Sequence, residues 1–186
     1  MKFYKHLDLN KDFQSLLQNI TPYLIKHYAH RQEFFIPLDV KKILNEFPNL
    51  QTIFNPYAIT VVDLAVIVSN AQWHDFIHVD YHSSVGTDTK ESDAVRINLP
   101  ILNCEKSTTN YYRLKDGKQT KTDADGNLQR VIYADFNDCE LIDSFRLYVP
   151  TVLRTDVLHN VILDEGVDRR MSLTVKFKEN LEFFLA

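Results

Sequence analysis

The hydrophobic pattern of this 186-residue chain changes near residue 50. Before this point, apolar residues recur at spacings of three and four, which is the period of an amphipathic helix. The pattern predicts a helix over residues 11–29, broken or kinked at Pro22, and a shorter helix over residues 38–47. The apolar positions of the two segments are Phe13, Leu16, Leu17, Ile20, Tyr23, Leu24, Tyr28, Val40, Ile43, Leu44 and Phe47.

The rest of the chain has the character of short β-strands, because its apolar runs are rich in β-branched and aromatic residues. Turn residues separate these runs, and Asp116-Gly117 and Asp125-Gly126 predict tight turns. A helical start followed by many strands indicates an α+β, mainly β fold, a sandwich or barrel with the N-terminal helices packed outside. The expected strands are 59–68, 76–81, 95–102, 108–112, 129–134, 144–153, 157–163 and 172–177.

Length and composition favour one globular domain over residues 1–186, with a helical part at 1–50 and a β core at 51–186. Hydrophobic residues make up 45% and charged residues 25%, which is typical of a folded protein. The net charge of −4 argues weakly against binding to a phosphate backbone, so no nucleic-acid partner is expected.

The location of the protein is predicted to be the cytoplasm, without attachment to a membrane. The N-terminal residues lack the apolar stretch of a signal peptide. The longest apolar run, residues 58–68, contains Asp63 and is too short to span a bilayer. Cys104 and Cys139 show no CxxC spacing and are interpreted as reduced thiols, although a disulfide between them is an open alternative.

The sequence His78-Val79-Asp80 carries the first candidate chemistry. Alternate residues of a strand point to the same side, so His78 and Asp80 are expected to project together. His159 lies in a second apolar strand, and two imidazoles with one carboxylate form a triad suited to non-haem Fe(II). An isolated pair of this kind is more often a surface pair, and an isolated histidine in an apolar strand is more often hydrogen-bonded in the core.

Arg170 follows His159 by 170 − 159 = 11 positions, with a turn expected at residues 164–166. Strand alternation places Arg170 with Ser172, and Arg169 on the other face. A guanidinium beside a hydroxyl can bind both oxygens of a carboxylate. The alternative is a solvated arginine pair at the start of a strand.

The order and spacing of these residues resemble the Fe(II)/2-oxoglutarate-dependent oxygenase superfamily. The resemblance spans about residues 60–178, and residues 95–105, 107–112 and 153–161 are similar to small bacterial and phage members near the aspartyl/asparaginyl β-hydroxylase-like group. Those hydroxylases proper usually lack the carboxylate of the triad, whereas Asp80 is present here.

The resemblance implies a double-stranded β-helix, a jelly-roll or cupin-like barrel, in which His78, Asp80 and His159 bind Fe(II). It implies 2-oxoglutarate as co-substrate, with its distal carboxylate on Arg170 and Ser172; the further hydrogen-bonding candidates are Asn98 and Tyr112. The implied enzyme is a dioxygenase that hydroxylates an unidentified small molecule or peptide side chain and releases succinate and carbon dioxide. No catalytic residue beyond the metal centre is expected.

Three other functions remain open at this point. The chain could be a non-catalytic, cupin-like binding or sensing module that has kept the triad. It could be a metal-dependent cupin enzyme that does not use 2-oxoglutarate. A protein-interaction domain built on the N-terminal helices is the third alternative.

Overall fold

The computed structural model describes residues 2–8, 10–70, 77–80, 94–124 and 130–186. The predicted N-terminal helix is present as α1 (Lys11–Tyr28), and the Asn10 side chain caps it by accepting a hydrogen bond from the Phe13 backbone N–H. The expected break at Pro22 does not occur, since α1 continues through it. A proline inside a helix costs about 3 kcal/mol. Ile20 and Leu24, which precede and follow Pro22, are both fully buried against the core. Burial of each side chain contributes about 1.5–3 kcal/mol to the free energy of unfolding, which offsets the cost of the proline.

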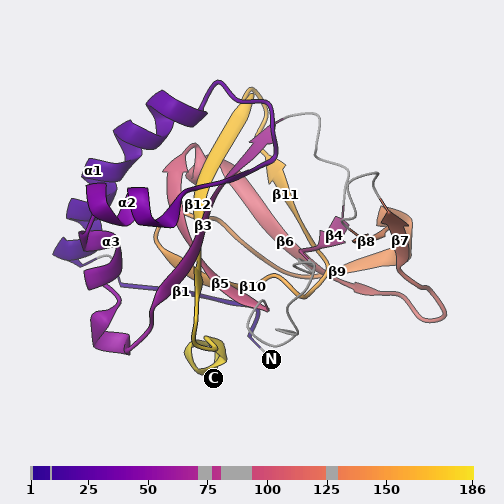
Figure 1. Cartoon of the computed structure of the whole chain (residues 1–186). Helices are drawn as coiled ribbons and strands as arrows, with labels where there is room; N and C mark the ends of the chain where they lie inside the picture. Colours follow the sequence, from indigo (N-terminus) through magenta and orange to yellow (C-terminus); the bar gives the residue numbers. More distant parts are fainter. Residues whose placement is uncertain (1, 9, 71–76, 81–93, 125–129) are drawn as a thin grey trace.

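Two shorter helices follow α1. They are α2 (Val40–Glu46), capped by Asp39, and α3 (Asn49–Thr52). Figure 1 shows all three helices together on one side of the molecule, against the sheet that contains β3 (Val61–Asn70) and β12 (Arg169–Phe177). The prediction that the N-terminal helices pack outside a mainly β structure is confirmed.

The strands of the described residues form two six-stranded antiparallel sheets. We call them sheet A and sheet B. Sheet A has the order β1-β10-β5-β12-β3-β2, in which the strands not yet given are β1 (Tyr4–His6), β10 (Thr151–Arg154), β5 (Val95–Leu102) and β2 (Phe35–Pro37). Neighbouring strands of sheet A come from distant parts of the sequence, because β12 pairs with both β3 and β5.

Sheet B has the order β7-β8-β4-β11-β6-β9. Its strands are β7 (Lys121–Ala124), β8 (Arg130–Ala134), β4 (Ile77–Val79), β11 (His159–Leu163), β6 (Ser107–Leu114) and β9 (Cys139–Phe145). The short strand β4 lies between β8 and β11, and this pairing brings the two predicted histidine strands side by side.

The predicted strands are largely present, with one clear error. Residues 144–153 do not form one strand: β9 ends at Phe145, and β10 begins at Thr151 in the other sheet. Pro150 has no N–H for a strand ladder, and its position between the two strands marks the boundary that the apolar pattern concealed. The predicted turn at Asp116-Gly117 is present, with a positive φ of 75° at Gly117.

Some predictions fall on residues outside the described ranges. These are the ends of the expected strand 76–81, residue 129, and the turn at Asp125-Gly126. Both cysteines, Cys104 and Cys139, are buried and free. Within the described parts of the chain, no helix is long and apolar enough to cross a membrane.

The main core lies between α1 and one face of sheet A. We call this the helix face of sheet A. Strand β12 contributes every second residue to it, namely the buried residues Met171, Leu173 and Val175.

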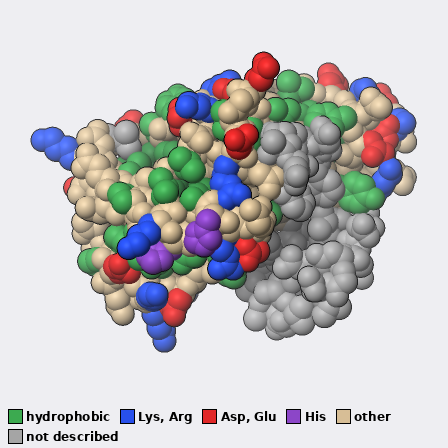
Figure 2. All heavy atoms as spheres, turned by 90° about the horizontal axis from the view of Figure 1, so that it is seen from above, with side chains coloured by type: hydrophobic (Ala, Val, Ile, Leu, Met, Phe, Trp, Pro, Cys, Tyr) green, Lys and Arg blue, Asp and Glu red, His purple; other side chains and the backbone are tan. Residues whose placement is uncertain are grey.

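The outer surface of the protein has a mixed character: in the view of Figure 2, acidic and basic side chains are interspersed with apolar ones. The opposite face of sheet A, which we call the inner face, carries Arg170, Ser172 and the other polar residues considered below.

Candidate metal centre

His78 and Asp80 come from β4 and from the residue that follows it. The strand alternation predicted from the sequence holds, because the His78 Nε2 atom lies 3.1 Å from Asp80 Oδ1. The Asp80 backbone N–H donates to the Thr155 carbonyl at 2.9 Å, and Thr155 N–H donates in turn to the Ala94 carbonyl. Asp80 is therefore fixed to the end of β10 and the start of β5, although it lies just outside a strand.

His159 begins β11 and lies directly opposite His78 in the antiparallel register. The two rings are 4.7 Å apart between centroids. His159 is buried, with 5% exposure, and its Nδ1 lies 2.8 Å from the Val157 carbonyl oxygen. A carbonyl can only accept a hydrogen bond, so Nδ1 carries the proton and Nε2 keeps a lone pair.

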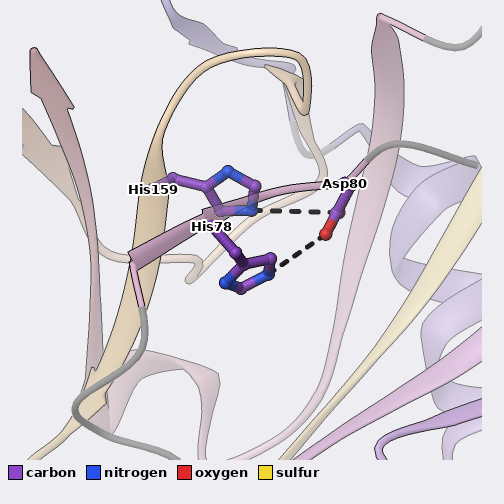
Figure 3. A group of neighbouring side chains, drawn as sticks. All are labelled: His78, Asp80 and His159. Atoms are coloured by element: carbon purple, nitrogen blue, oxygen red, sulfur yellow. Dashed lines mark ion pairs between the residues drawn. The ribbon is translucent and has the colours of Figure 1, made fainter. Parts of the chain in front are cut away.

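The three side chains converge on one point, as Figure 3 shows. His159 Nε2 lies 3.8 Å from Asp80 Oδ2, and one donor atom from each of the three residues lies within 4.8 Å of the others. In an octahedral metal site with bonds of about 2.0–2.2 Å, adjacent donors lie roughly 3 Å apart. The observed cluster needs only small side-chain movements to reach this spacing.

The electrostatics of the cluster favour the metal-binding forms of Asp80 and His159. Burial alone would raise the pKa of Asp80, but His159, His78 and Arg96 together outweigh it and hold that pKa well below its ordinary value. Burial lowers the pKa of His159, against the opposing effect of Asp80. A carboxylate and a neutral imidazole are the states required of metal ligands.

This donor set fits Fe(II). Two imidazoles and one carboxylate occupy one side of the metal and leave positions open for other ligands. The second nitrogen of His159 is held by a backbone carbonyl, an arrangement that fixes the orientation of ligating histidines in metal sites. His78, Asp80 and His159 can therefore hold iron.

Arg170 and Ser172 lie on the inner face of sheet A. Their cross-strand partners on β3 are Ser69 and Ile67, while the alternating residues Met171 and Leu173 pack in the core against α1. Arg170 is 2% exposed and Ser172 is fully buried. The predicted pairing of this arginine with this hydroxyl on one face is therefore present.

Sheet A and sheet B face each other through this inner face. Leu153 of β10 packs with Tyr111 of β6, and Tyr111 lies opposite His159 in sheet B. The Tyr111 hydroxyl donates to the Arg154 carbonyl of sheet A at 3.0 Å. The face of sheet B that carries the cluster thus looks onto the face of sheet A that carries Arg170.

The inner face of sheet A holds an unusual set of buried polar atoms without hydrogen-bond partners among the described residues. Most buried polar atoms in proteins are satisfied, and a group of unsatisfied ones on one face requires an explanation. The arginine nitrogens and the hydroxyls of this set can donate hydrogen bonds to an anionic group, whereas the amide oxygen can only accept one. The atoms are Ser69 Oγ, Arg96 Nε, Asn98 Oδ1, Arg170 Nε and Ser172 Oγ.

The neighbouring Arg169 has a different environment. It lies on the helix face of the sheet, and its guanidinium donates to the Ala29 carbonyl at the C-terminal end of α1. A cation at this end of a helix is favourable, because the last carbonyls are otherwise unpaired. The sequence argument that preferred Arg170 to Arg169 as the inward-facing arginine agrees with this geometry.

The two additional candidates, Asn98 and Tyr112, have different positions. Asn98 lies opposite Thr174 on β12, on the inner face, and its Oδ1 is among the unsatisfied atoms. Tyr112 follows Tyr111 and faces the other way, where its hydroxyl donates to Asn160 Oδ1 at 3.2 Å. The structure brings Asn98 to the face of Arg170 and does not bring Tyr112 there.

Three residues of this region were not predicted from the sequence. Tyr111, rather than Tyr112, lies beside His159, with the two ring centroids 6.1 Å apart. Ser69 lies directly opposite Arg170, and Arg96 is a second buried arginine on the inner face. The alternation of apolar and polar residues over 95–99 was a signal for Arg96, because it places Arg96 on the same side as Asn98.

Comparison with known proteins gives a likeness in structure alone. No protein-family model and no curated protein matches the sequence. The non-haem α-ketoglutarate-dependent carbocyclase SnoK from nogalamycin biosynthesis aligns with a TM-score of 0.54 and 12% identity, over 95% of this chain and 79% of SnoK. Iron-bound HygX from Streptomyces hygroscopicus aligns with a TM-score of 0.52 and 9% identity, over 95% of this chain and 82% of HygX.

A third solved structure gives the same result. The non-haem α-ketoglutarate-dependent epimerase SnoN, also from nogalamycin biosynthesis, aligns with a TM-score of 0.51 and 12% identity, over 96% of this chain and 78% of SnoN. None of the three is described as an aspartyl/asparaginyl β-hydroxylase. This chain therefore shares its fold, two antiparallel sheets with helices on one outer side, with SnoK, SnoN and HygX.

Proposed function

We propose that the protein is an Fe(II)- and 2-oxoglutarate-dependent oxygenase that hydroxylates a small molecule or a peptide side chain. The observation that carries the proposal is the convergence of His78, Asp80 and His159 on the face of sheet B that looks onto buried Arg170. The three similar structures support the general reaction class and also indicate its breadth, since they include a carbocyclase and an epimerase. Hydroxylation is the outcome we propose for this chain.

In this proposal the two sheets form a double-stranded β-helix with the metal between them. Bound Fe(II) and 2-oxoglutarate supply the oxidising chemistry, with succinate and carbon dioxide as co-products. His78, Asp80 and His159 hold the metal at one side and leave its other positions open. The fixed tautomer of His159 keeps Nε2 directed at the metal position.

Arg170 and Ser172 bind the distal carboxylate of 2-oxoglutarate in this proposal. The guanidinium supplies a planar pair of donors, and the Ser172 hydroxyl adds a third. Both groups are buried, so the charge-assisted hydrogen bonds form away from water, where they are strongest. Asn98, on the same face, is proposed as a further hydrogen-bonding partner, and Tyr112 is left out of the set because it faces the other way.

The proposal is tested by anaerobic titration of Fe(II)-loaded protein with 2-oxoglutarate, followed by admission of air and measurement of succinate. We expect saturable co-substrate binding that depends on the metal, and slow succinate formation even without the primary substrate. Binding of metal without binding of 2-oxoglutarate would instead support a cupin enzyme of another kind. Co-substrate binding without any turnover would support a sensing module.

Two matched variants make this experiment specific. Arg170→Gln should weaken 2-oxoglutarate binding at least about tenfold, because a charge-assisted pair is lost. Arg169→Gln removes the same charge from the adjacent residue on the helix face and should leave co-substrate binding unchanged. Equal effects of the two substitutions would contradict the assignment of Arg170.

A further inference from the structure

Arg96 is the second arginine of the inner face of sheet A, and its location can be fixed from its neighbours. Val95 and Ile97 belong to the core against α1, so Arg96, between them, projects from the opposite face. Its cross-strand partner is Leu153, which packs with Tyr111 beside His159. Arg96 therefore belongs to the space between the sheets, close to the candidate metal centre.

The charge of Arg96 is buried and unpaired within the described chain. The residue is 4% exposed, and its Nε has no hydrogen-bond partner among the described residues. Its positive charge is near enough to stabilise the ionised carboxylate of Asp80, but the two do not form an ion pair. Burying a charge without hydrogen-bonded partners is costly, and a hydrogen-bonding anion from a ligand would offset that cost.

Arg96 and Arg170 mark opposite ends of the inner face. Strands β12 and β5 are antiparallel, and Thr174 of β12 lies opposite Asn98 of β5. The same register places residue 176 of β12 opposite Arg96. Arg170 lies 176 − 170 = 6 residues from that position, so the Cα atoms at the two positions of β12 are roughly 20 Å apart at about 3.3 Å per residue.

Arg96 is 4% exposed, but it lies close to a partly exposed group of sheet B. The side chain of Asp80 is 26% exposed, whereas Arg170 is 2% exposed and Ser172 is fully buried. If the distal carboxylate of 2-oxoglutarate lies at Arg170, the co-substrate extends from the closed end towards the metal. Arg96 then remains as a cation without a hydrogen-bond partner among the described residues, on the side of partly exposed Asp80.

We propose that Arg96 binds an anionic group of the primary substrate, which makes that substrate a small acid or an acidic peptide segment. The inference rests on the function proposed above and adds the chemical class of the molecule that is oxidised. A carboxylate on Arg96 would be held beside the metal by a planar, two-donor contact. Such a contact orients the rest of the molecule and positions one of its C–H bonds at the open side of the metal.

The test uses acetate as a minimal anionic probe, with acetamide as its neutral counterpart of similar size. The protein is loaded with Mn(II) in place of Fe(II) and saturated with 2-oxoglutarate, so that Arg170 is occupied and no turnover takes place. Calorimetry and the thermal unfolding midpoint then report binding of each probe. We expect acetate to bind this complex more tightly than acetamide, and Arg96→Gln to reduce acetate binding at least about tenfold.

Arg96→Lys is the matched variant that keeps the charge but not the planar fork, and it should retain part of the acetate affinity. Equal acetate binding by the wild type and Arg96→Gln would overturn the proposal, as would absence of a preference for acetate over acetamide. A loss of 2-oxoglutarate affinity of tenfold or more in Arg96→Gln would overturn it too, since the co-substrate would then be the ligand of Arg96. Failure of the wild type to bind 2-oxoglutarate would instead reject the proposed function, which separates the two results.

Discussion

The two faces of sheet A use the same strands for opposite purposes. On the helix face, Met171, Leu173 and Val175 are fully buried in an apolar core under α1. On the inner face, Arg170, Ser172 and Thr174 are buried almost as completely, but two of these three carry polar atoms without partners in the described chain. One face of the sheet thus stabilises the fold, while the other holds buried polar atoms that have no hydrogen-bond partner among the described residues.

This difference follows from the energetics of burial. An apolar side chain contributes about 1.5–3 kcal/mol when it leaves water, whereas an unpaired polar group loses its hydration and is destabilising by about 1–3 kcal/mol. The inner face therefore reduces the stability of the unliganded protein. Functional sites commonly show this exchange of stability for activity.

The largest expected effect comes from a substitution at the candidate metal centre, which lies on sheet B opposite the inner face of sheet A. Asp80→Ala should reduce succinate formation more than about 100-fold, because one of the three metal ligands is lost. The fold should remain, since the Asp80 backbone N–H still donates to Thr155. Metal content after dialysis measures the loss of the ligand, and circular dichroism checks that the fold remains. The control is His27→Ala, which replaces an exposed histidine of α1. Retained metal binding in Asp80→Ala would contradict the assignment.

A substitution on the helix face should affect stability instead. Leu173→Ala is expected to lower the free energy of unfolding by about 2–5 kcal/mol, because it removes a fully buried side chain and leaves a cavity. Urea denaturation measures this change. The remaining folded protein should bind 2-oxoglutarate as the wild type does, and a specific loss of co-substrate affinity would show that the two faces are not independent.

Arg170→Met should sharpen the comparison, because its effects on stability and binding have opposite signs. Without ligand, removal of a buried, unpaired charge should leave the free energy of unfolding unchanged or raise it by about 1–2 kcal/mol. With 2-oxoglutarate at about 100 times its Kd, the free energy of unfolding of the wild type should rise by about 2.7 kcal/mol, and that of the variant by much less. Thermal unfolding with and without the co-substrate measures both. A destabilised, unliganded variant would mean that Arg170 is paired within the protein.

The smallest effect is expected at Ser172. Its buried hydroxyl has no partner among the described residues, so Ser172→Ala should leave the free energy of unfolding unchanged or raise it by up to about 1 kcal/mol. Ser107 is a matched control, because it is equally buried but its Oγ donates to the Cys104 carbonyl at 2.9 Å. Ser107→Ala should lower the free energy of unfolding by about 1 kcal/mol or more, because this hydrogen bond is lost. Equal costs in urea denaturation would indicate that Ser172 is also satisfied by the protein.

Much of this site could be predicted from strand alternation. The placement of His78 with Asp80 and of Arg170 with Ser172 requires only that alternate residues of a strand share a face. The helices over 11–28 and 40–46 were equally accessible, because an apolar stripe of period 3.6 is a local property of the chain. The persistence of α1 through Pro22 was not, since it depends on burial of Ile20 and Leu24 against the distant strands of sheet A.

The sequence could not show which of the adjacent residues Tyr111 and Tyr112 lies beside His159. Tyr111 and Tyr112 have the same chemistry, and a shift of one residue in the pairing of β6 with β11 would exchange the faces they occupy. Only the register that places Tyr111 opposite His159 decides which of them lies beside the metal centre. The error over residues 144–153 has a similar origin, because the assignment of β9 and β10 to different sheets depends on distant partners.

The sequence by itself determined which residues carry the chemistry and which neighbours along one strand act together, since these properties depend on side-chain type and local geometry. The tertiary structure decided which separate strands meet. It brought His159 opposite His78, placed Tyr112 on the other face of its sheet, and placed Arg96 opposite Leu153, which packs in one cluster with Tyr111. These contacts depend on pairing between residues far apart in the chain, and that pairing is set by the burial of whole sheets rather than by any local pattern.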